Sequence, residues 1–258
     1  MNILLDPSAR PVIGHRGNRA HAPENTLESF AQALAASADA IEFDVHLSAD
    51  GIPVVHHDRT VNRTTNGTGE IGRLTLDQLR ELDAGANFSN DGGRTFPYRG
   101  KGHRIPTLDE VIVSFPSAPL LIEIKTPQAS VAIRKAIEAH NAGGRVLVDS
   151  MYREALDPFR DSSIPYGAAS NDVRRLMWEV VTGFAITPAK YKAICVPLSY
   201  NGLPLPVKRF ARVGPKYDWR VHVWTINDPA VAVDLWKAGV NGIITDDPAL
   251  MLQARMRV

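Results

Sequence analysis

Two acidic residues alternate with apolar ones near the start of the chain, in the run Ile41-Glu42-Phe43-Asp44-Val45. Side chains alternate across a β-strand, so Glu42 and Asp44 are expected on one face, about 6–7 Å apart along the chain. Two carboxylates on a covered face repel each other unless positive charge lies between them. The sequence leaves two sources of that charge open: Arg or Lys side chains, or a divalent cation.

A third acid, Glu123, lies in a similar run, Leu121-Ile122-Glu123-Ile124-Lys125, where it shares a face with Lys125. Polar residues at the C-terminal end of a strand line the active site when that strand belongs to a barrel. Three carboxylates form an all-oxygen ligand set, which favours Mg²⁺ or Ca²⁺ over zinc. Lys125 is then either a salt-bridge partner of Glu123 or a fixed charge for an anionic substrate.

His15 ends another predicted strand, in Ile13-Gly14-His15-Arg16-Gly17, where the flanking glycines let backbone and ligand approach closely. Arg16 could hold two oxygens of a phosphate group at once, with Lys125 as a second cation. These residues indicate a site for an anionic, phosphate-bearing substrate.

Two more histidines follow in the run Val54-Val55-His56-His57-Asp58. The pair Asp50-Gly51 before it is typical of a tight turn between antiparallel strands, so the run should return toward the rim that carries the paired acids. Side-chain alternation lets only one of His56 and His57 face the site, and the spacing does not say which. Two imidazoles flanking a phosphodiester suit general acid–base catalysis.

The elements that must position these residues follow an alternating pattern of short β-branched runs and helical stretches, which predicts a parallel sheet. Without the returning arm of the hairpin, eight strands remain, the count of a TIM-type (β/α)8 barrel. We expect one such domain over residues 1–258. The predicted strands are Pro11–His15, Ala40–Leu47, Ile52–His57, Leu120–Lys125, Arg145–Ser150, Pro165–Ala169, Ala193–Pro197, Val221–Ile226 and Gly242–Thr245. The main predicted helices are Glu24–Ala36, Ser130–Ala142, Asn171–Gly183, Pro229–Ala238 and Pro248–Arg255.

Residues 59–106 interrupt this rhythm after the second strand and its hairpin. The segment is rich in Gly, Thr, Asn and Arg and contains one weak helix pattern, Thr75–Leu82. A segment of this length is too long for a passive connection. We expect a small folded insertion or a lid beside the active site.

The overall composition excludes several other classes of protein. Lys plus Arg is 29 and Asp plus Glu is 28, so the chain has no basic surplus for nucleic-acid binding. One cysteine, Cys195, excludes an intramolecular disulfide and a multi-cysteine zinc site. No apolar run approaches the roughly 20 residues of a transmembrane helix, and residues 1–12 lack the features of a signal peptide. We expect a cytoplasmic protein without a transmembrane segment, and the sequence leaves a homo-oligomer open.

The order and spacing of these motifs resemble the glycerophosphodiester phosphodiesterase family, from residue 13 to about residue 248. The motifs that carry the resemblance are His15-Arg16-Gly17, Pro23-Glu24-Asn25-Thr26, Glu42-Phe43-Asp44, Val54-Val55-His56-His57-Asp58, Glu123-Ile124-Lys125, Ile105-Pro106-Thr107-Leu108, Val223-Trp224-Thr225-Ile226-Asn227 and Ile244-Thr245-Asp246. The resemblance implies a TIM-type barrel that uses Mg²⁺ or Ca²⁺ to hydrolyse glycerophosphodiesters, small molecules, to glycerol 3-phosphate and an alcohol.

The same resemblance implies a role for each site residue, motif by motif. Trp224 would form a wall of the substrate pocket, although an aromatic that packs the barrel is the alternative. The implied metal ligands are Glu42, Asp44 and Glu123, the implied catalytic pair is His15 and His57, and the implied substrate-binding residues are Arg16, Lys125 and Trp224.

Two other functions fit the same residues less well. A phospholipase D-like lyase of the same barrel type would cleave choline-bearing phospholipids and form cyclic phosphates, but such secreted relatives carry disulfides. A binding protein with a decayed site would not retain both histidines, three acids and both cations. The sequence leaves open the head-group alcohol, the choice between Mg²⁺ and Ca²⁺, and whether the substrate's own hydroxyl or water attacks phosphorus.

Overall fold

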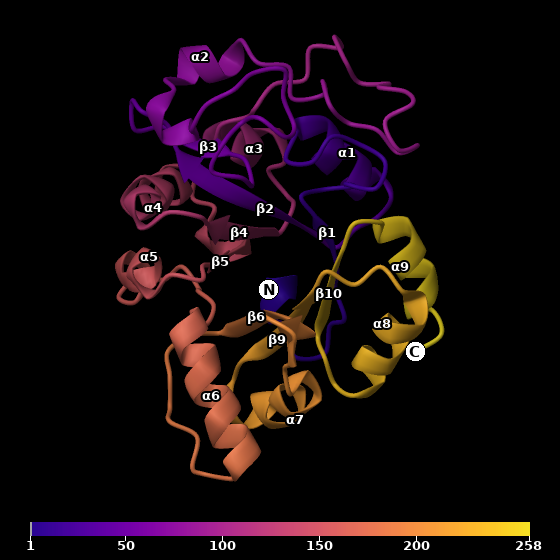
Figure 1. The fold of residues 1–258 in the computed structure, drawn as a ribbon. Coiled ribbons are helices and arrows are strands. Elements are labelled where there is room, and N and C mark those ends of the chain that lie inside the picture. Colours follow the sequence, from indigo (N-terminus) through magenta and orange to yellow (C-terminus); the bar gives the residue numbers. More distant parts are fainter. Residues whose placement is uncertain (1) are drawn as a thin grey trace.

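The protein is a TIM-type barrel, in which a ring of parallel strands is surrounded by helices (Figure 1). The computed structural model describes residues 2–258. In hydrogen-bonded order, the parallel strands are β5 (Val146–Asp149), β4 (Leu120–Ile124), β2 (Ala40–Leu47), β1 (Val12–His15), β10 (Gly242–Thr245), β9 (Arg220–Trp224) and β6 (Ala193–Pro197). The predicted fold class is confirmed.

The segment 165–169 closes the ring between β5 and β6, but it is not the full strand that the sequence predicts. It forms only two isolated parallel bridges, Val148 with Tyr166 and Gly167 with Ala193. Pro165 has no N–H to donate and Gly167 has no side chain to pack, and both features weaken a strand interior. A side chain at Gly167 would also collide with the carboxylate of Asp149 on β5.

The predicted hairpin is present after β2. β3 (Pro53–Val55) pairs antiparallel with β2, with Val55 opposite Val45 and Pro53 opposite Leu47. This strand ends two residues earlier than predicted, so His56 and His57 lie just beyond it. Strand alternation therefore does not decide where these two side chains point.

Helices cover the outside of the ring (Figure 1). All five main predicted helices occur, within a few residues at each end, as does the weak one in the insertion. Three helices were not predicted: α3 (Leu108–Ser114), although Thr107 and Glu110 form a capping box at its start; the short α5 (Arg153–Leu156); and α7 (Val207–Tyr217), in which Gly214 and Pro215 suggest a loop. The helices are α1 (Leu27–Ala35), α2 (Leu76–Arg80), α3 (Leu108–Ser114), α4 (Ser130–Ala139), α5 (Arg153–Leu156), α6 (Ser170–Thr182), α7 (Val207–Tyr217), α8 (Pro229–Lys237) and α9 (Pro248–Arg255).

The core has an outer layer between strands and helices and a smaller layer inside the barrel. Leu4, in the 3₁₀ turn η1 (Ile3–Leu5), is fully buried against the inner layer. His222 on β9 contacts the carbonyl oxygen of Leu4 at 2.9 Å through Nε2 and holds this turn in place. The inner layer comprises Leu4, Ile13, Ala40, Leu121, Leu147, Ala193 and Ile244. With its interior filled in this way, the barrel offers its strand C-termini to a site.

Residues 59–106 carry little regular structure, namely η2 (Ile71–Arg73) and α2. Their apolar side chains form a cluster of their own, which includes Val61, Ile71, Leu79 and Ile105 and packs on Val54 of β3. Within residues 2–258, no helix has the length and hydropathy needed to cross a membrane.

Candidate active site

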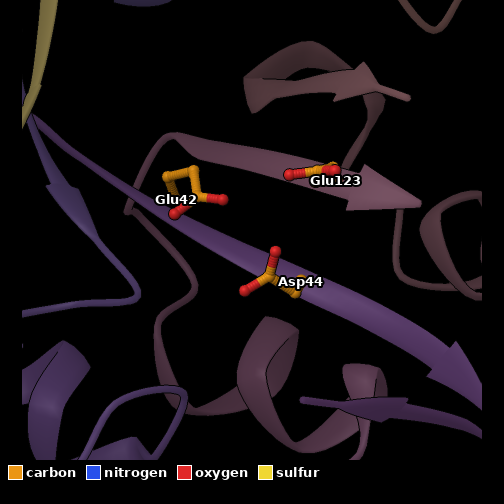
Figure 2. Close-up of side chains that lie close together, drawn as sticks. All are labelled: Glu42, Asp44 and Glu123. Carbon is orange, nitrogen blue, oxygen red and sulfur yellow. The ribbon is translucent and has the colours of Figure 1, made fainter. Parts of the chain in front are cut away.

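The three predicted acids lie together at the barrel mouth. Glu42 and Asp44 project from β2 and Glu123 from the neighbouring β4, and Figure 2 shows their carboxylates converging. In the sheet register, Asp44 lies opposite Glu123. One oxygen atom of each carboxylate lies within 4.8 Å of one from each of the others. Alternation along β2 and the parallel register with β4 produce this cluster.

Two cations neutralise Asp44 in part. Lys125 Nζ lies 3.0 Å from Asp44 Oδ1 and 3.0 Å from Glu123 Oε1. On the other side, Arg16 Nε is 3.3 Å from Asp44 Oδ2, and Asn25 Nδ2 donates to the same oxygen at 2.9 Å. The sequence left open which positive groups lie beside the paired acids. Arg16 and Lys125, the two basic residues of the predicted site, are among them.

The pKa values of the three acids differ because Asp44 contacts the side chains of both Arg16 and Lys125, whereas Glu123 contacts Lys125. Burial by itself raises the pKa of Asp44, but Lys125 and Arg16 outweigh it and lower the pKa to about 2. Burial, Asp44 and Glu123 raise the pKa of Glu42 well above its usual value. Burial raises the pKa of Glu123 as well, against the opposing effect of Lys125.

The residues present fit a divalent cation. Glu42, Asp44 and Glu123 offer only oxygen ligands, and two of the three carboxyl groups lack enough positive charge nearby to ionise easily. Hard cations such as Mg²⁺ and Ca²⁺ prefer such carboxylate sites. These three residues would hold the ion.

Each predicted catalytic histidine is paired with a carboxylate. His15 Nδ1 lies 2.6 Å from Asp246 Oδ1, and His57 Nδ1 lies 2.6 Å from Asp58 Oδ1. A carboxylate at Nδ1 holds a proton there and leaves Nε2 free to exchange protons with a substrate. Burial and the charge of Lys125 lower the pKa of His57, against Asp44. Asp58 and Asp246 were not identified from the sequence as site residues.

His56 and His57 occupy different positions in the structure. His57 lines a cavity of about 160 Å³ together with His15, Glu42 and Glu123, whereas His56 does not. His56 is buried, its Nε2 lies 3.1 Å from the carbonyl oxygen of Thr60, and burial lowers its pKa to about 4. A third histidine, His46, supports the loop through a 3.0 Å contact between its Nε2 and the carbonyl oxygen of His57.

Arg16 is positioned by its backbone as well as by its side chain. Its φ of 54° lies in the left-handed region, and its N–H donates to Glu42 Oε2 at 2.9 Å. Gly17, with φ of 89°, follows where a side chain would collide with Ser29. The turn that positions Arg16 therefore requires glycine at position 17.

Glu24 joins three arginines beside the cavity. Its carboxylate accepts from Arg16 Nη1 at 2.7 Å, from Arg19 Nε at 3.0 Å and from Arg63 Nη2 at 2.7 Å. Burial alone would raise the pKa of Glu24, but Arg63 and Arg16 bring it well below its usual range.

Two of these arginines also contact the carboxylates that pair with the two histidines. Arg63 Nε lies 2.7 Å from Asp58 Oδ2, and Arg19 Nη1 lies 3.2 Å from Asp246 Oδ2. A chain of ion pairs therefore connects both histidines through Glu24. Arg63 was not identified as a site residue, and no local sequence pattern indicates its role.

Trp224, at the end of β9, is half-buried and lines the same cavity. All eight predicted site residues thus surround one cavity or contact a residue that does. The cavity is lined by His15, Arg16, Glu42, His57, Leu121, Glu123, Lys125, Asp149, Met151, Cys195, Trp224 and Ile244. Asp44 contacts Arg16 and Lys125 behind it.

Comparisons with known proteins agree with this geometry. Residues 15–157 and 220–249 match the glycerophosphoryl diester phosphodiesterase family. A glycerophosphodiester phosphodiesterase of Caldanaerobacter subterraneus is 33% identical over 258 aligned residues, which cover 93% of this chain and 96% of the relative.

Solved structures of phosphodiesterases are also similar to this chain. The phosphodiesterase of Oleispira antarctica, in complex with the product sn-glycerol-3-phosphate, superposes with a TM-score of 0.77 at 27% identity and covers 95% of this chain and 96% of its own. The glycerophosphodiester phosphodiesterase of Thermotoga maritima superposes with a TM-score of 0.69 at 27% identity, over 95% of this chain and 97% of its own. The chain belongs to the glycerophosphoryl diester phosphodiesterase family.

Proposed function

We propose that the protein hydrolyses glycerophosphodiesters to glycerol 3-phosphate and an alcohol, with a divalent cation held by Glu42, Asp44 and Glu123. The observation that carries the proposal is that two imidazoles, each held by a carboxylate, line the same small cavity as two of these acids. The product bound to the Oleispira relative supports glycerol 3-phosphate as one product.

The phosphodiester is proposed to bind between Arg16 and Lys125, which would hold its non-bridging oxygens. A bound Mg²⁺ or Ca²⁺ would neutralise charge that develops on the phosphate oxygens during the reaction. Burial around Asp44 strengthens the electrostatic effect of both basic side chains.

His15 and His57 are proposed to move the protons. The lowered pKa of His57 keeps its imidazole neutral near pH 7, and this suits it to accept the proton of the nucleophile. His15, with Asp246 behind it, then donates a proton to the oxygen of the departing alcohol. The nucleophile is either the hydroxyl of the glycerol half, which gives a cyclic phosphate for water to open, or water itself.

The test is replacement of each histidine. His15→Ala and His57→Ala should each lower kcat for glycerophosphocholine by at least about 10³-fold, with an unchanged circular dichroism spectrum. His140→Ala is the matched control, because His140, which directly follows α4, pairs with Asp109 at 2.7 Å outside the cavity. Wild-type rates in either site variant would contradict the assignment.

The products distinguish hydrolysis from the lyase alternative. Phosphorus NMR should show glycerol 3-phosphate as the final product, with at most transient cyclic phosphate. A cyclic phosphate that accumulates as the end product would favour the phospholipase D-like lyase.

A further inference from the structure

Two aromatic rings are exposed on the outside of the barrel, at the C-terminal end of α6. Trp178 and Phe184 are 56% and 61% exposed, and their rings stack with centroids 4.7 Å apart. Val181, between them in the sequence, is 54% exposed. The other side of α6 packs on the barrel core through the buried Leu176. The exposed side chains therefore take no part in the core, and large apolar groups gathered on a surface mark an interaction site.

The surface beside these rings is basic. α7 lies next to α6 and contacts it (Figure 1), and four of its side chains that face solvent are basic: Lys208, Arg209, Arg212 and Lys216. Residues 170–192 and 207–217 together contain eight basic residues and two acidic ones, whereas the whole chain has 29 and 28. The charge of the protein is thus unevenly distributed, with a positive excess beside the exposed rings.

The two acidic residues of these segments offset little of this charge at the surface. The side chains of Asp172 and Glu179 are 14% and 7% exposed, and both lie beside Arg175, at 3.5 Å and 3.9 Å. Three basic residues of the segments pair with acids elsewhere, namely Lys190, Lys192 and Lys208. Within residues 2–258, no carboxylate forms an ion pair with the exposed side chains of Arg209, Arg212 or Lys216. These three cations can therefore meet an anionic partner.

We propose that α6 and α7 dock the protein on the surface of a bilayer that contains anionic lipids, with Trp178 and Phe184 inserted among the lipid headgroups. Exposed aromatic rings beside lysines and arginines are typical of surfaces that lie in the interfacial region of a membrane. Arg209, Arg212 and Lys216 would lie near lipid phosphates, where each adds an attraction that salt weakens. This docking is separate from the proposed function, which uses the barrel mouth and needs no membrane.

Charge favours a bilayer over a second copy of the chain as the partner. In a symmetric dimer the same surface of both subunits meets, so this basic face would lie against itself. Like charges across an interface oppose association. The largely covered carboxylates of Asp172 and Glu179 cannot compensate for them. An anionic bilayer carries the complementary charge.

Sedimentation of the full chain with sucrose-loaded vesicles tests the proposal. Vesicles of phosphatidylcholine with about 30% phosphatidylglycerol should bind the protein at least about tenfold more strongly than vesicles of phosphatidylcholine alone. A rise in salt from about 0.1 M to about 0.5 M should weaken this binding several-fold. Absence of binding, or equal binding to both kinds of vesicle, overturns the proposal.

Variants of the exposed rings locate the contact. The double variant Trp178→Ser/Phe184→Ser should lower the vesicle partition coefficient at least about tenfold. Both positions are exposed and lie away from the catalytic cavity, so the fold and the turnover of glycerophosphocholine should be retained. Val113→Ser/Val131→Ser on α3 and α4 is the matched control, because these side chains are 61% and 54% exposed on other helices. Equal partition of the two double variants overturns the proposal.

Reversal of the basic charge is the second variant. Arg209→Glu/Arg212→Glu should also lower binding to anionic vesicles at least about tenfold, because two attractive charges become repulsive. Binding to neutral vesicles should not fall with it. Wild-type binding of this variant to anionic vesicles would contradict the role of α7.

Quenching of fluorescence by lipids brominated on their acyl chains shows which tryptophan enters the bilayer. Trp219 and Trp236 are each 1% exposed, and Trp224 is half-buried at the barrel mouth. Trp178→Phe keeps an aromatic ring and should still bind, but the quenching seen in the wild type should disappear. Quenching that persists in Trp178→Phe overturns the proposal. So does a dimer in sedimentation velocity that Trp178→Ser/Phe184→Ser dissociates, because it would assign this face to a second copy.

Discussion

Arg63 and Glu24 form a bidentate ion pair, with Nη1 2.8 Å from Oε2 and Nη2 2.7 Å from Oε1. The same guanidinium contacts Asp58, whose carboxylate holds His57. Arg63 lies in the insertion of residues 59–106, far along the chain from Glu24. We propose that this insertion belongs to the active site through Arg63, as a support for the hairpin end that carries His57.

Arg63→Gln should lower kcat about tenfold, because His57 loses its alignment. It should also move the acidic limb of the kcat/KM–pH profile to higher pH. Without the guanidinium, the charge of Asp58 acts fully on His57 and raises the pKa of the imidazole, so a higher pH is needed to keep it neutral. A pH profile of each enzyme checks the shift. Arg59→Gln is the control, because Arg59 is exposed and pairs with Glu70 on the surface. A shift to lower pH in Arg63→Gln would contradict this role.

Asp246→Asn should lower kcat for glycerophosphodiesters by about 10²-fold, because the amide cannot hold the imidazolium of His15 as a carboxylate does. It should also lower stability in a pH-dependent way. Burial raises the pKa of Asp246, but His15, with Asn227 and Arg19, outweighs it and brings the pKa to about 2, below the ordinary 3.8. The stabilisation is therefore complete above about pH 4 and is lost as the pH falls toward 2. Urea unfolding at pH 7 and pH 2 measures it, and an equal difference between variant and wild type at both values would refute the assignment.

Removal of divalent cations should abolish activity, and addition of Mg²⁺ or Ca²⁺ should restore it. At 100 times its Kd, the ion should stabilise the fold by about 2.7 kcal/mol, or roughly 5–10 °C in Tm. Glu123→Gln should raise the cation concentration for half-maximal activity at least tenfold. Glu138→Gln on α4, where Glu138 pairs with Arg134, is the control. Full activity in excess EDTA would exclude the metal from the proposed function.

The part of the site that the sequence predicts is the part that depends on local geometry. Glu42 and Asp44 share a face because side chains alternate along any strand, and Glu123 joins them because β2 and β4 are parallel neighbours in register. The fold class follows from counting strands between helices. Each of these steps needs only a short window of sequence and one rule of chain geometry.

The unpredicted part depends on contacts between distant segments or on the exact end of an element. Alternation could not decide between His56 and His57, because β3 ends at Val55 and alternation no longer applies beyond it; only the family resemblance selected His57. Asp246 reaches His15 from the other end of the chain, and Arg63 reaches Glu24 from an irregular loop. Neither pair follows a periodic pattern in the sequence, so neither could be predicted from one.

Gly17→Ala should have two effects: it should destabilise the fold and displace Arg16. The glycine adopts a φ of 89°, and a Cβ there would lie 2.6 Å from the backbone carbon of Ser29, so both strain and collision oppose the substitution. We expect a loss of at least about 2 kcal/mol in the free energy of unfolding by urea. Gly51→Ala separates the two effects, because Gly51 has a similar φ of 80° with no atom within 4 Å of its Cβ, and it should lose only about 1 kcal/mol. Since the Arg16 N–H holds Glu42, activity should fall in Gly17→Ala and remain in Gly51→Ala. Equal losses of stability in the two variants would show that backbone strain, and not the packing of Gly17 on α1, requires glycine in the motif.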